Sequence, residues 1–231
     1  MMEAQVNSMF DARNEWLKKR LGKFTASQIY RLVKGSRGGD LTYIEEIVSE
    51  ITSMQAKEDI STLRALEWGA SNEQDAVQLF SELYGKDLHV DYFGVSEPEF
   101  FPYNEFSGGS PDGIVRKGND RISVLEMKCP HVGSKHIRFL TASLNGASND
   151  WLKSNNEDYF CQVQFNMMCA SKKYNVPVKH AYFSSFDPRT VNPLHRLAVI
   201  EIYEDKEYQE KIDTKITEAV EKAAELLTLL G

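Results

Sequence analysis

Two short segments of the sequence combine carboxylates with an amine, the groups that metal-assisted hydrolysis of a phosphate ester uses. The first is Ser110-Pro111-Asp112-Gly113, and the second is Glu126-Met127-Lys128, with thirteen residues between the two acids. Side chains alternate along a strand, so Glu126 and Lys128 share one face of a strand that is otherwise apolar. Burying these charges among apolar neighbours costs free energy unless a partner compensates them.

The turn Lys117-Gly118-Asn119-Asp120 predicts a hairpin that places Asp112 beside Glu126. Two converging carboxylates repel each other unless a cation lies between them, and hard oxygen ligands suit Mg²⁺ or Mn²⁺. We therefore expect Asp112 and Glu126 to bind the metal and Lys128 to align or deprotonate an attacking water. The alternative is structural: Glu126 and Lys128 form an ion pair on an edge strand, and Asp112 caps a turn.

A second group of residues, near the N-terminus, suits the binding of a phosphate. Arg20 precedes Gly22, and Thr25 stands three residues before Gln28, the spacing of a capping box that starts a helix. The first amides of such a helix lack partners within it, so these amides, a hydroxyl and a guanidinium together form a phosphate cradle. The structural alternative is that Thr25 and Ser27 only cap a helix and that Arg20 is a solvated charge.

Two glutamines, Gln162 and Gln164, lie on a predicted helix over residues 157–173. Their neighbours Phe160, Val163 and Met167 are apolar, so at least one of the two amides should point inward and need a hydrogen-bond partner. That partner is either a group of a reactive centre or the neighbouring sheet, and the spacing leaves both open.

Hydrophobic periodicity predicts the elements that position these residues. Helices are expected from Thr25, from Thr42, over 63–84, over 157–173 and from about Asp205. Strands are expected over 88–96, 113–116, 121–129, 178–186 and 196–203, mainly as an antiparallel meander. This order indicates a mixed α/β fold in which helices cover a central sheet. We expect one domain over 1–231, with a mainly helical part over 1–85, the sheet over 86–204 and a last helix over 205–231.

Composition and charge argue against several other classes of protein. The chain has 231 residues and three cysteines without a CxxC pair, which argues against a disulfide framework and a zinc ribbon. No apolar run is long enough for a membrane span or a secretory signal, so a cytoplasmic location is expected. Charge is segregated along the chain: residues 11–40 carry +5, residues 67–112 carry -9 and residues 201–231 carry -5, within a total net charge of -7. These blocks are either solvated helix faces or a basic entry beside an acidic, cation-binding site.

Pro111-Asp112 with Glu126-Met127-Lys128 resembles the metal-binding motif of the PD-(D/E)XK nucleases. Further segments, in matching order and spacing from about residue 16 to residue 190, resemble the phage lambda exonuclease group, the YqaJ-type viral recombinases. They are Arg20-Leu21-Gly22 with Thr25-Ala26-Ser27, Trp68-Gly69 with Glu73 and Asp75-Ala76, Ser110-Pro111-Asp112-Gly113 with Leu125-Glu126-Met127-Lys128-Cys129-Pro130, and Gln162-Val163-Gln164-Phe165.

The resemblance implies a restriction-endonuclease-like core, a central mixed sheet flanked by helices with a helical N-terminal region, and gives roles to single residues. Asp112 and Glu126 would bind the metal, and Glu73, Lys128 and Gln164 would complete the catalytic centre. Leu66 lies near where relatives place an apolar wedge that separates the DNA strands, although a core leucine is the alternative. Glu105 is the nearest match to an upstream acid of some relatives, and it is left outside the site. Four residues would hold the 5′-phosphate of DNA: Arg20, Ser27, Arg37 and Ser110.

The activity that the resemblance implies is Mg²⁺-dependent 5′→3′ digestion of double-stranded DNA, with Mn²⁺ as a substitute cation. It would release 5′-mononucleotides and leave 3′ single-stranded overhangs for recombination by strand annealing. The implied partners are DNA ends with a 5′-phosphate, a single-strand annealing protein and further copies of the chain in a ring-shaped homotrimer, with no membrane. Two alternatives remain: a PD-(D/E)XK endonuclease of restriction or repair type, and a DNA-end-binding protein without hydrolysis.

Overall fold

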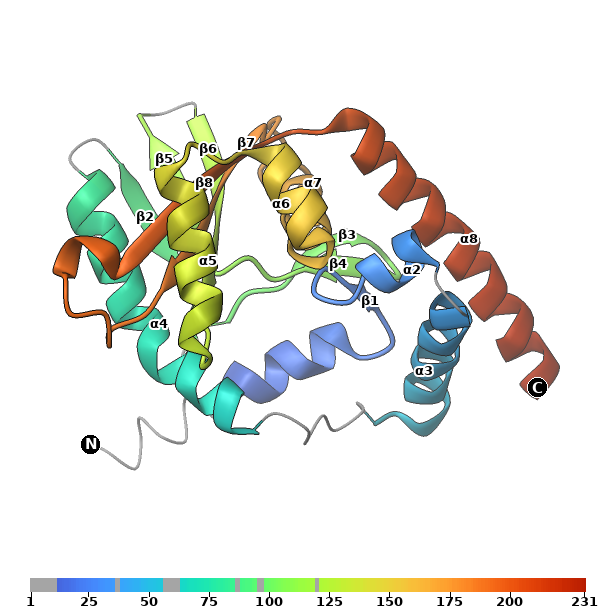
Figure 1. The fold of residues 1–231 in the computed structure, drawn as a ribbon. Coiled ribbons are helices and arrows are strands. Elements are labelled where there is room, and N and C mark those ends of the chain that lie inside the picture. The colour runs from blue at the N-terminus through green and yellow to red at the C-terminus, as the bar shows by residue number, and fades with distance from the viewer. Residues whose placement is uncertain (1–11, 36–37, 56–62, 86–87, 95–97, 119–120) are drawn as a thin grey trace.

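Helices surround two β-sheets in the computed structural model of the chain (Figure 1). The structure describes residues 12–35, 38–55, 63–85, 88–94, 98–118 and 121–231. The helices are residues 12–20, α2 (Tyr30–Lys34), α3 (Gly39–Ser53), α4 (Leu63–Tyr84), α5 (Gly133–Leu144), α6 (Asn149–Asn155), α7 (Glu157–Tyr174), the short η3 (Pro193–His195) and α8 (Lys206–Leu230). The strands are β1 (Phe24–Thr25), β2 (His89–Tyr92), β3 (Phe101–Asn104), β4 (Ser107–Gly109), β5 (Gly113–Lys117), β6 (Arg121–Lys128), β7 (His180–Phe186) and β8 (Leu197–Tyr203).

The larger sheet has the strand order β2-β5-β6-β7-β8 and is mixed, as the resemblance implies. β5 and β6 form the expected antiparallel hairpin, with Gly113 opposite Leu125, and Gly118 adopts a positive φ of 62° in the turn between them. The sheet is mainly antiparallel, as expected, but it is not a simple meander, because β6 and β7 are parallel. A parallel pair needs a long crossover, and α5, α6 and α7 supply it.

Alternation along β6 divides its side chains between two apolar clusters on opposite faces of the sheet. Leu125 and Met127 pack with Phe80 of α4, whereas Val124 packs in the cluster that includes Phe165 of α7. Glu126 lies on the face of Val124, toward α7, and is fully buried there. The predicted strand alternation is therefore confirmed, and it places a carboxylate under α7.

A smaller sheet, with the order β1-β4-β3, was not predicted from the sequence. Thr25 lies in β1 opposite Gly108 of β4, so the expectation that Thr25 starts a helix is wrong. A helical turn does follow, since Gln28 and Ile29 both donate backbone hydrogen bonds to the carbonyl of Thr25. The strand forms because Phe24 and Thr25 are buried between β4 and the helices, so tertiary packing outweighs the local capping signal.

Several predicted boundaries are confirmed and others move by a few residues. α4 covers residues 63–84 as expected, and α8 begins after Asp205, whose carboxylate accepts from the amide of Tyr208 as an N-cap. The helix expected from Thr42 begins earlier, at Gly39, and the strand expected over 88–96 is described only over His89–Tyr92. α5 and α6 were not predicted as helices.

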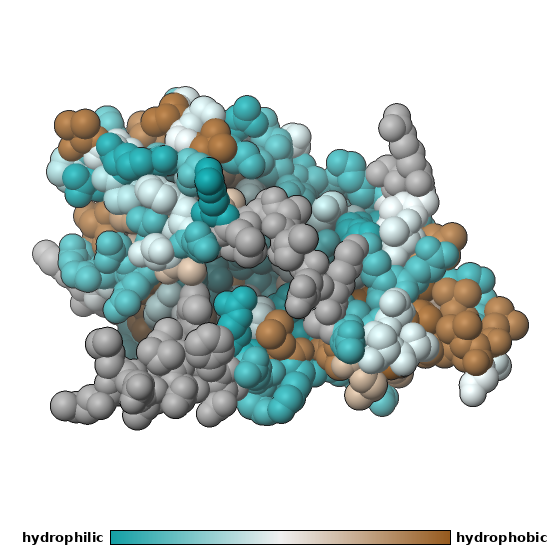
Figure 2. Space-filling view, turned by 90° about the horizontal axis from the view of Figure 1, so that it is seen from below, coloured by the Kyte–Doolittle hydropathy of each residue, from teal (hydrophilic) through white to brown (hydrophobic). Residues whose placement is uncertain are grey.

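The surface also has an apolar end. Figure 2 shows brown residues gathered at the right of the molecule, where Figure 1 places the end of α8 beside α3. Leu229 and Leu230 of α8 are 82% and 68% exposed, and Leu41 of α3 is 43% exposed. Among the described residues, no helix has both the length and the hydropathy that a membrane crossing needs.

Candidate active site

A buried ion pair joins the two charged residues of β6. Lys128 Nζ lies 2.5 Å from Glu126 Oε1, and the Glu126 side chain is only 1% exposed. Burial acts to lower the pKa of Lys128, but the carboxylates of Glu126 and Asp112 outweigh it and hold this pKa above its ordinary value. Lys128 therefore carries its charge in the site, and the ring of Tyr159 lies 5.2 Å from its ammonium.

Asp112 lies immediately before β5 and reaches across to β6. Its Oδ2 accepts a hydrogen bond from the backbone amide of Met127 at 2.6 Å, the residue between Glu126 and Lys128. Burial, together with the charges of Glu126 and Glu73, raises the pKa of Asp112 well above its ordinary value. The hairpin thus places Asp112 close enough to Glu126 for the two carboxylates to repel each other.

Glu73 brings a third carboxylate to the same place from α4. Burial raises the pKa of Glu73 to about 7. The charge of Lys128 opposes this rise, and the charge of Glu126 adds to it. A hydrogen bond with Tyr92 also opposes the rise. Cys129, which directly follows the end of β6, lies near the same acids: burial, Glu73 and Asp112 raise the pKa of its thiol to about 12. Elements far apart in the sequence therefore contribute acids to one site.

The structure brings Gln162, and not Gln164, to this site. Gln162 Nε2 donates to Glu126 Oε1 at 2.6 Å, and Gln162 Oε1 accepts from Lys128 Nζ at 3.3 Å. The expectation that Gln164 belongs to the centre is therefore corrected. Residues two apart on a helix point about 200° apart, so only one of the pair can face β6.

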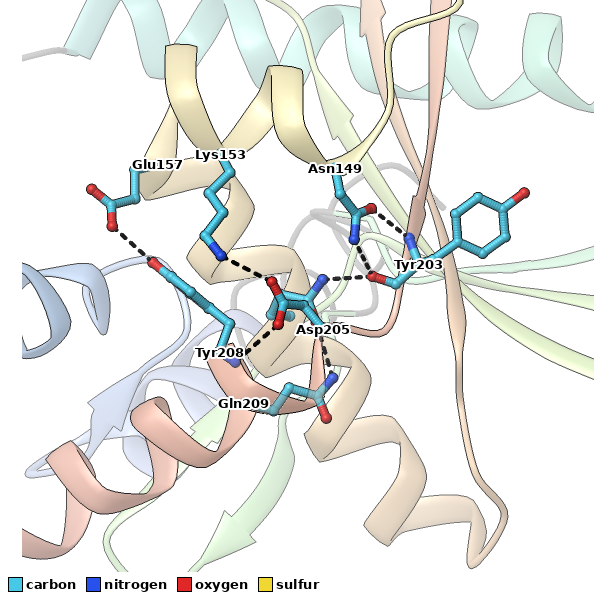
Figure 3. A network of polar contacts seen from close by, with 8 residues as sticks. Asn149, Lys153, Glu157, Tyr203, Asp205, Tyr208 and Gln209 are labelled. Atoms are coloured by element: carbon cyan, nitrogen blue, oxygen red, sulfur yellow. Dashed lines mark hydrogen bonds and ion pairs between the residues drawn. The ribbon is translucent and has the colours of Figure 1, made fainter.

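Gln164 instead anchors the start of α8. Its amide donates to the carbonyl of Tyr203 at 2.8 Å and accepts from the amide of Asp205 at 3.1 Å and from Gln209 at 3.0 Å. Figure 3 shows the surrounding network, in which Lys153 of α6 also donates to Asp205. Gln164 therefore has a structural role, the alternative that the sequence left open.

Asn166 belongs to the site as well, and the sequence analysis missed it. It lies one helical turn after Gln162, is fully buried, and donates from Nδ2 to Glu126 Oε2 at 2.9 Å. The i, i+4 spacing from Gln162 could have revealed it, since residues at that spacing share a helix face.

One cavity of about 200 Å³ joins the acids to the residues expected to hold phosphate. Arg20, Ser27 and Ser110 line it together with Glu73, Asp112 and Gln162. Trp16, which also lines the cavity, connects two of the phosphate candidates, because its indole N–H donates to Ser110 Oγ at 2.9 Å and the Arg20 guanidinium stacks 4.1 Å from its ring. Burial lowers the pKa of Arg20, against the charges of Tyr43 and Glu50.

The structure differs in detail from the phosphate cradle that the sequence predicts near the N-terminus. The amide of Ala26 already donates to the carbonyl of Gly108, and that of Gln28 donates to the carbonyl of Thr25. These two amides are therefore not open donors for an anion, and a guanidinium and hydroxyls remain as the main groups that could bind a phosphate. Arg37 lies outside the described residues, as does the side chain of Leu66. Glu105 is exposed, and its carbonyl accepts from Lys23.

The carboxylates of the site suit a hard cation, although those that the structure describes do not form a complete set of metal ligands. Across the described parts of the chain, no group of three or more His, Cys, Asp or Glu side chains is arranged to hold a metal ion. Asp112 and Glu126 nevertheless offer oxygen ligands only, and the charge of Glu126 raises the pKa of both Asp112 and Glu73. A divalent cation would relieve this repulsion, and oxygen donors are what Mg²⁺ and Mn²⁺ prefer.

The fold resembles those of known exonucleases. Two crystal structures of LHK-Exo, an alkaline exonuclease from Laribacter hongkongensis, one of them in complex with dAMP, superpose with a TM-score of 0.73 at 22% identity. The match covers 94% of this chain and 95% of that protein. A phage-related exonuclease from Haemophilus somnus 129PT gives a TM-score of 0.63 at 14% identity, covering 90% of this chain and 96% of that one. At these identities the likeness establishes the fold.

A sequence match establishes the family. No curated protein matches the chain. The model of the YqaJ-like viral recombinase domain, however, matches residues 15–173, which include every described residue of the site. Because this match spans well over half of the sequence and the fold agrees with it, the chain belongs to the YqaJ-like viral recombinase family.

Proposed function

We propose that the protein is a Mg²⁺-dependent exonuclease that digests double-stranded DNA in the 5′→3′ direction from a 5′-phosphorylated end. The observation that carries this proposal is the single cavity in which Arg20, Ser27 and Ser110 lie with Asp112 and Glu73. One end of the cavity offers donors for a terminal phosphate, and the other offers acids that suit a cation. A strand end held by the donors would present its phosphodiester to the acids.

The residues of the acidic end have distinct parts in this proposal. Asp112 and Glu126 would hold the cation, which would stabilise the charge developing on the phosphate and activate a water. Lys128, kept charged by Glu126 and Asp112, would orient the attacking water by hydrogen bonding. Gln162 would hold the Lys128 ammonium in place through its amide oxygen. Glu73, with a pKa of about 7, can accept a proton near neutral pH.

The donor end would select the phosphorylated terminus. Trp16 donates to Ser110 Oγ, so the Ser110 hydroxyl keeps its own hydrogen available for a phosphate oxygen. Arg20 stacks on the same indole, which limits the positions of its guanidinium and leaves its N–H groups for the phosphate. Ser27, exposed on the wall of the cavity, offers a further hydroxyl.

The relatives support the class of substrate and product. LHK-Exo is an alkaline exonuclease crystallised with dAMP, a deoxynucleoside monophosphate, which is the kind of product we propose for this chain. The family description, a viral recombinase, fits an enzyme that leaves 3′ single strands for annealing. We therefore propose a single-strand annealing protein as the partner that receives these strands.

A homotrimer is the assembly that we propose. The exposed leucines at the end of α8 and on α3 form an apolar surface that an oligomer can bury. Light scattering should give three times the 26.3 kDa of one chain. A mass of one chain at micromolar concentration would contradict the trimer.

Digestion of linear duplex DNA tests the activity. Duplexes with and without a 5′-phosphate are incubated in Mg²⁺ and in EDTA, and labels at the 5′ and 3′ ends report the direction. We expect Mg²⁺-dependent release of 5′-mononucleotides from phosphorylated 5′ ends, with Lys222→Ala as a control variant that removes an exposed lysine of α8. Covalently closed plasmid should stay intact; its cleavage would favour the endonuclease alternative. Binding of ends without any release of mononucleotides would favour the end-binding alternative.

A further inference from the structure

Asn166 connects Glu126 to the strand that leads to Asp112. Its Nδ2 donates to Glu126 Oε2 at 2.9 Å, and the whole side chain is buried. On its other side the amide oxygen faces Gly109 of β4, where an added Cβ would lie 2.1 Å from Asn166 Oδ1. Because Gly109 has no side chain, the amide of Asn166 fits against the backbone at this position, which directly precedes Ser110.

The two oxygens of Glu126 are held by different partners. Oε1 accepts from Lys128 and Gln162, and Gln162 lines the cavity. Oε2 accepts from Asn166, whose own Oδ1 has no hydrogen-bond partner within the described residues. A carboxylate only accepts, so Asn166 must present its NH₂ group to Glu126, and this direction leaves Oδ1 against Gly109. A buried amide oxygen without a partner costs free energy, which indicates that the site keeps this amide for a reason other than stability.

We propose that Asn166 is a positioning residue that fixes Glu126 Oε2 toward the interior and so presents Oε1 to the cation. This inference rests on the proposed function, because it assigns Glu126 as a cation ligand. Partners that orient a ligand from behind set the affinity of a metal site, and their loss typically costs about 10–100-fold in metal affinity or activity. A free carboxylate would have to lose rotamer freedom each time the cation binds, whereas Asn166 has already restricted it.

Gln164 provides a matched control two residues away on the same helix. Both side chains are fully buried amides of α7, but the bonds of Gln164 go to the end of β8 and the start of α8, and none goes to Glu126. Its loss should lower the unfolding midpoint without changing the cation site. A structural effect of removing a buried amide is thereby separated from an effect on Glu126.

Mn²⁺ titration, followed by the electron paramagnetic resonance signal of the free ion, tests the proposal without relying on activity. For Asn166→Leu, which keeps the volume and removes the donor, we expect the Mn²⁺ dissociation constant to rise about 10-fold or more. At saturating Mg²⁺, kcat should fall while the KM for DNA stays unchanged. Gln164→Leu should keep the wild-type Mn²⁺ affinity. Wild-type affinity in a folded Asn166→Leu would overturn the proposal.

Gly109→Ala provides a second route that does not delete the amide. The added Cβ should push Asn166 away from Glu126 and weaken Mn²⁺ binding by a similar factor. In Gly109→Ala/Asn166→Ala the two effects should not add, because the second change removes the clash made by the first. Full additivity, or wild-type Mn²⁺ affinity in Gly109→Ala, would refute the role of Asn166.

The outcomes for the inference and for the proposed function differ. If the wild type binds Mn²⁺ but degrades no DNA, the proposed function fails, and the Mn²⁺ affinities of the variants still decide the role of Asn166. If the wild type degrades DNA and Asn166→Leu matches it in both Mn²⁺ affinity and kcat, the inference fails alone. A wild type that binds no Mn²⁺ contradicts both.

Discussion

Gln162 donates to Glu126 Oε1 at 2.6 Å and so ties α7 to a strand 36 positions earlier in the chain. The same oxygen accepts from Lys128 at 2.5 Å, and the Lys128 ammonium lies 3.3 Å from Gln162 Oε1. Three side chains thereby close a small hydrogen-bonded ring beside the cavity. The ring orients an ammonium and a carboxylate that would otherwise have several staggered conformations to choose from.

This ring predicts opposite effects for two glutamines of one helix. Gln162→Ala should lower kcat by about 10–100-fold, the size of effect typical of groups that orient a metal ligand, with a small change in stability. Gln164→Ala should retain activity but lose about 1–3 kcal/mol of unfolding free energy, because the Tyr203 carbonyl and the half-buried Asp205 amide lose their bonds to this side chain. Steady-state kinetics measure kcat, and denaturant unfolding measures the unfolding free energy, for each of the two variants. The reverse pattern would restore Gln164 to the site.

Lys128→Ala should remove most of the activity. We expect kcat/KM to fall by about 10²–10⁴-fold, the range associated with a positioned proton-transfer group. The substitution also leaves Glu126 buried without its counter-charge, so unfolding free energy in EDTA should fall by about 3–5 kcal/mol. Kinetics are therefore measured well below the unfolding midpoint, with Lys222→Ala as the control. A folded Lys128→Ala that digests DNA at the wild-type rate would exclude the assigned role.

The raised pKa of Glu73 predicts how stability depends on pH in the absence of metal. A carboxyl whose pKa rises from 4.5 when unfolded to about 7 when folded stabilises the fold fully below the lower value. That contribution is lost as the pH rises through about 7, because the buried acid must then ionise. The midpoint of thermal unfolding in EDTA should therefore fall between pH 5 and pH 8.

Two controls isolate the contribution of Glu73. Glu73→Gln should flatten the pH dependence, since the amide carries no charge at any pH in this range. Mg²⁺ should raise the unfolding midpoint more at pH 8 than at pH 5.5, because protons compete with the cation for the carboxylates. A midpoint in EDTA that rises from pH 5 to pH 8 in the wild type would contradict the burial of this charge.

Arg20 should determine the preference for phosphorylated ends. Loss of a charge-assisted contact with phosphate corresponds to about 1.5–3 kcal/mol, so Arg20→Ala should reduce the preference for a 5′-phosphate by about 10–100-fold. Rates on matched duplexes with 5′-phosphate and 5′-hydroxyl ends measure the effect. The control is Arg121→Ala, which removes an exposed arginine at the end of β6 opposite Lys128 and should leave the preference unchanged. Trp16→Phe should partially weaken the preference for a 5′-phosphate, because Ser110 loses its hydrogen bond from the indole.

Local pattern predicted most of the larger sheet and the long helices. Alternating apolar residues and a glycine turn were enough for the β5–β6 hairpin, because register in a hairpin follows from the turn and from burial of one face. The 22 residues of α4 have a continuous helical apolar stripe and were predicted over the same range. Asp112, Glu126 and Lys128 could be related to one another because a single hairpin holds them all.

Contacts between distant segments could not be predicted in the same way. β1 has two residues and pairs in parallel with β4, so no run of alternating residues announces it, and the capping signal at Thr25 favoured a helix. The parallel pairing of β6 with β7 depends on how three helices pack, which local periodicity does not encode.

The sequence by itself determined which residue types are available: an acid pair with a lysine on one strand, an arginine with serines near the N-terminus, and two glutamines on one helix. Only the tertiary structure decided which of them meet. The rotation of α7 about its axis, set by the packing of Phe160, Val163 and Phe165, turns Gln162 and Asn166 to Glu126 and Gln164 to α8. A helix buried on most of its surface has no polar face from which that rotation can be read, so the choice follows from packing.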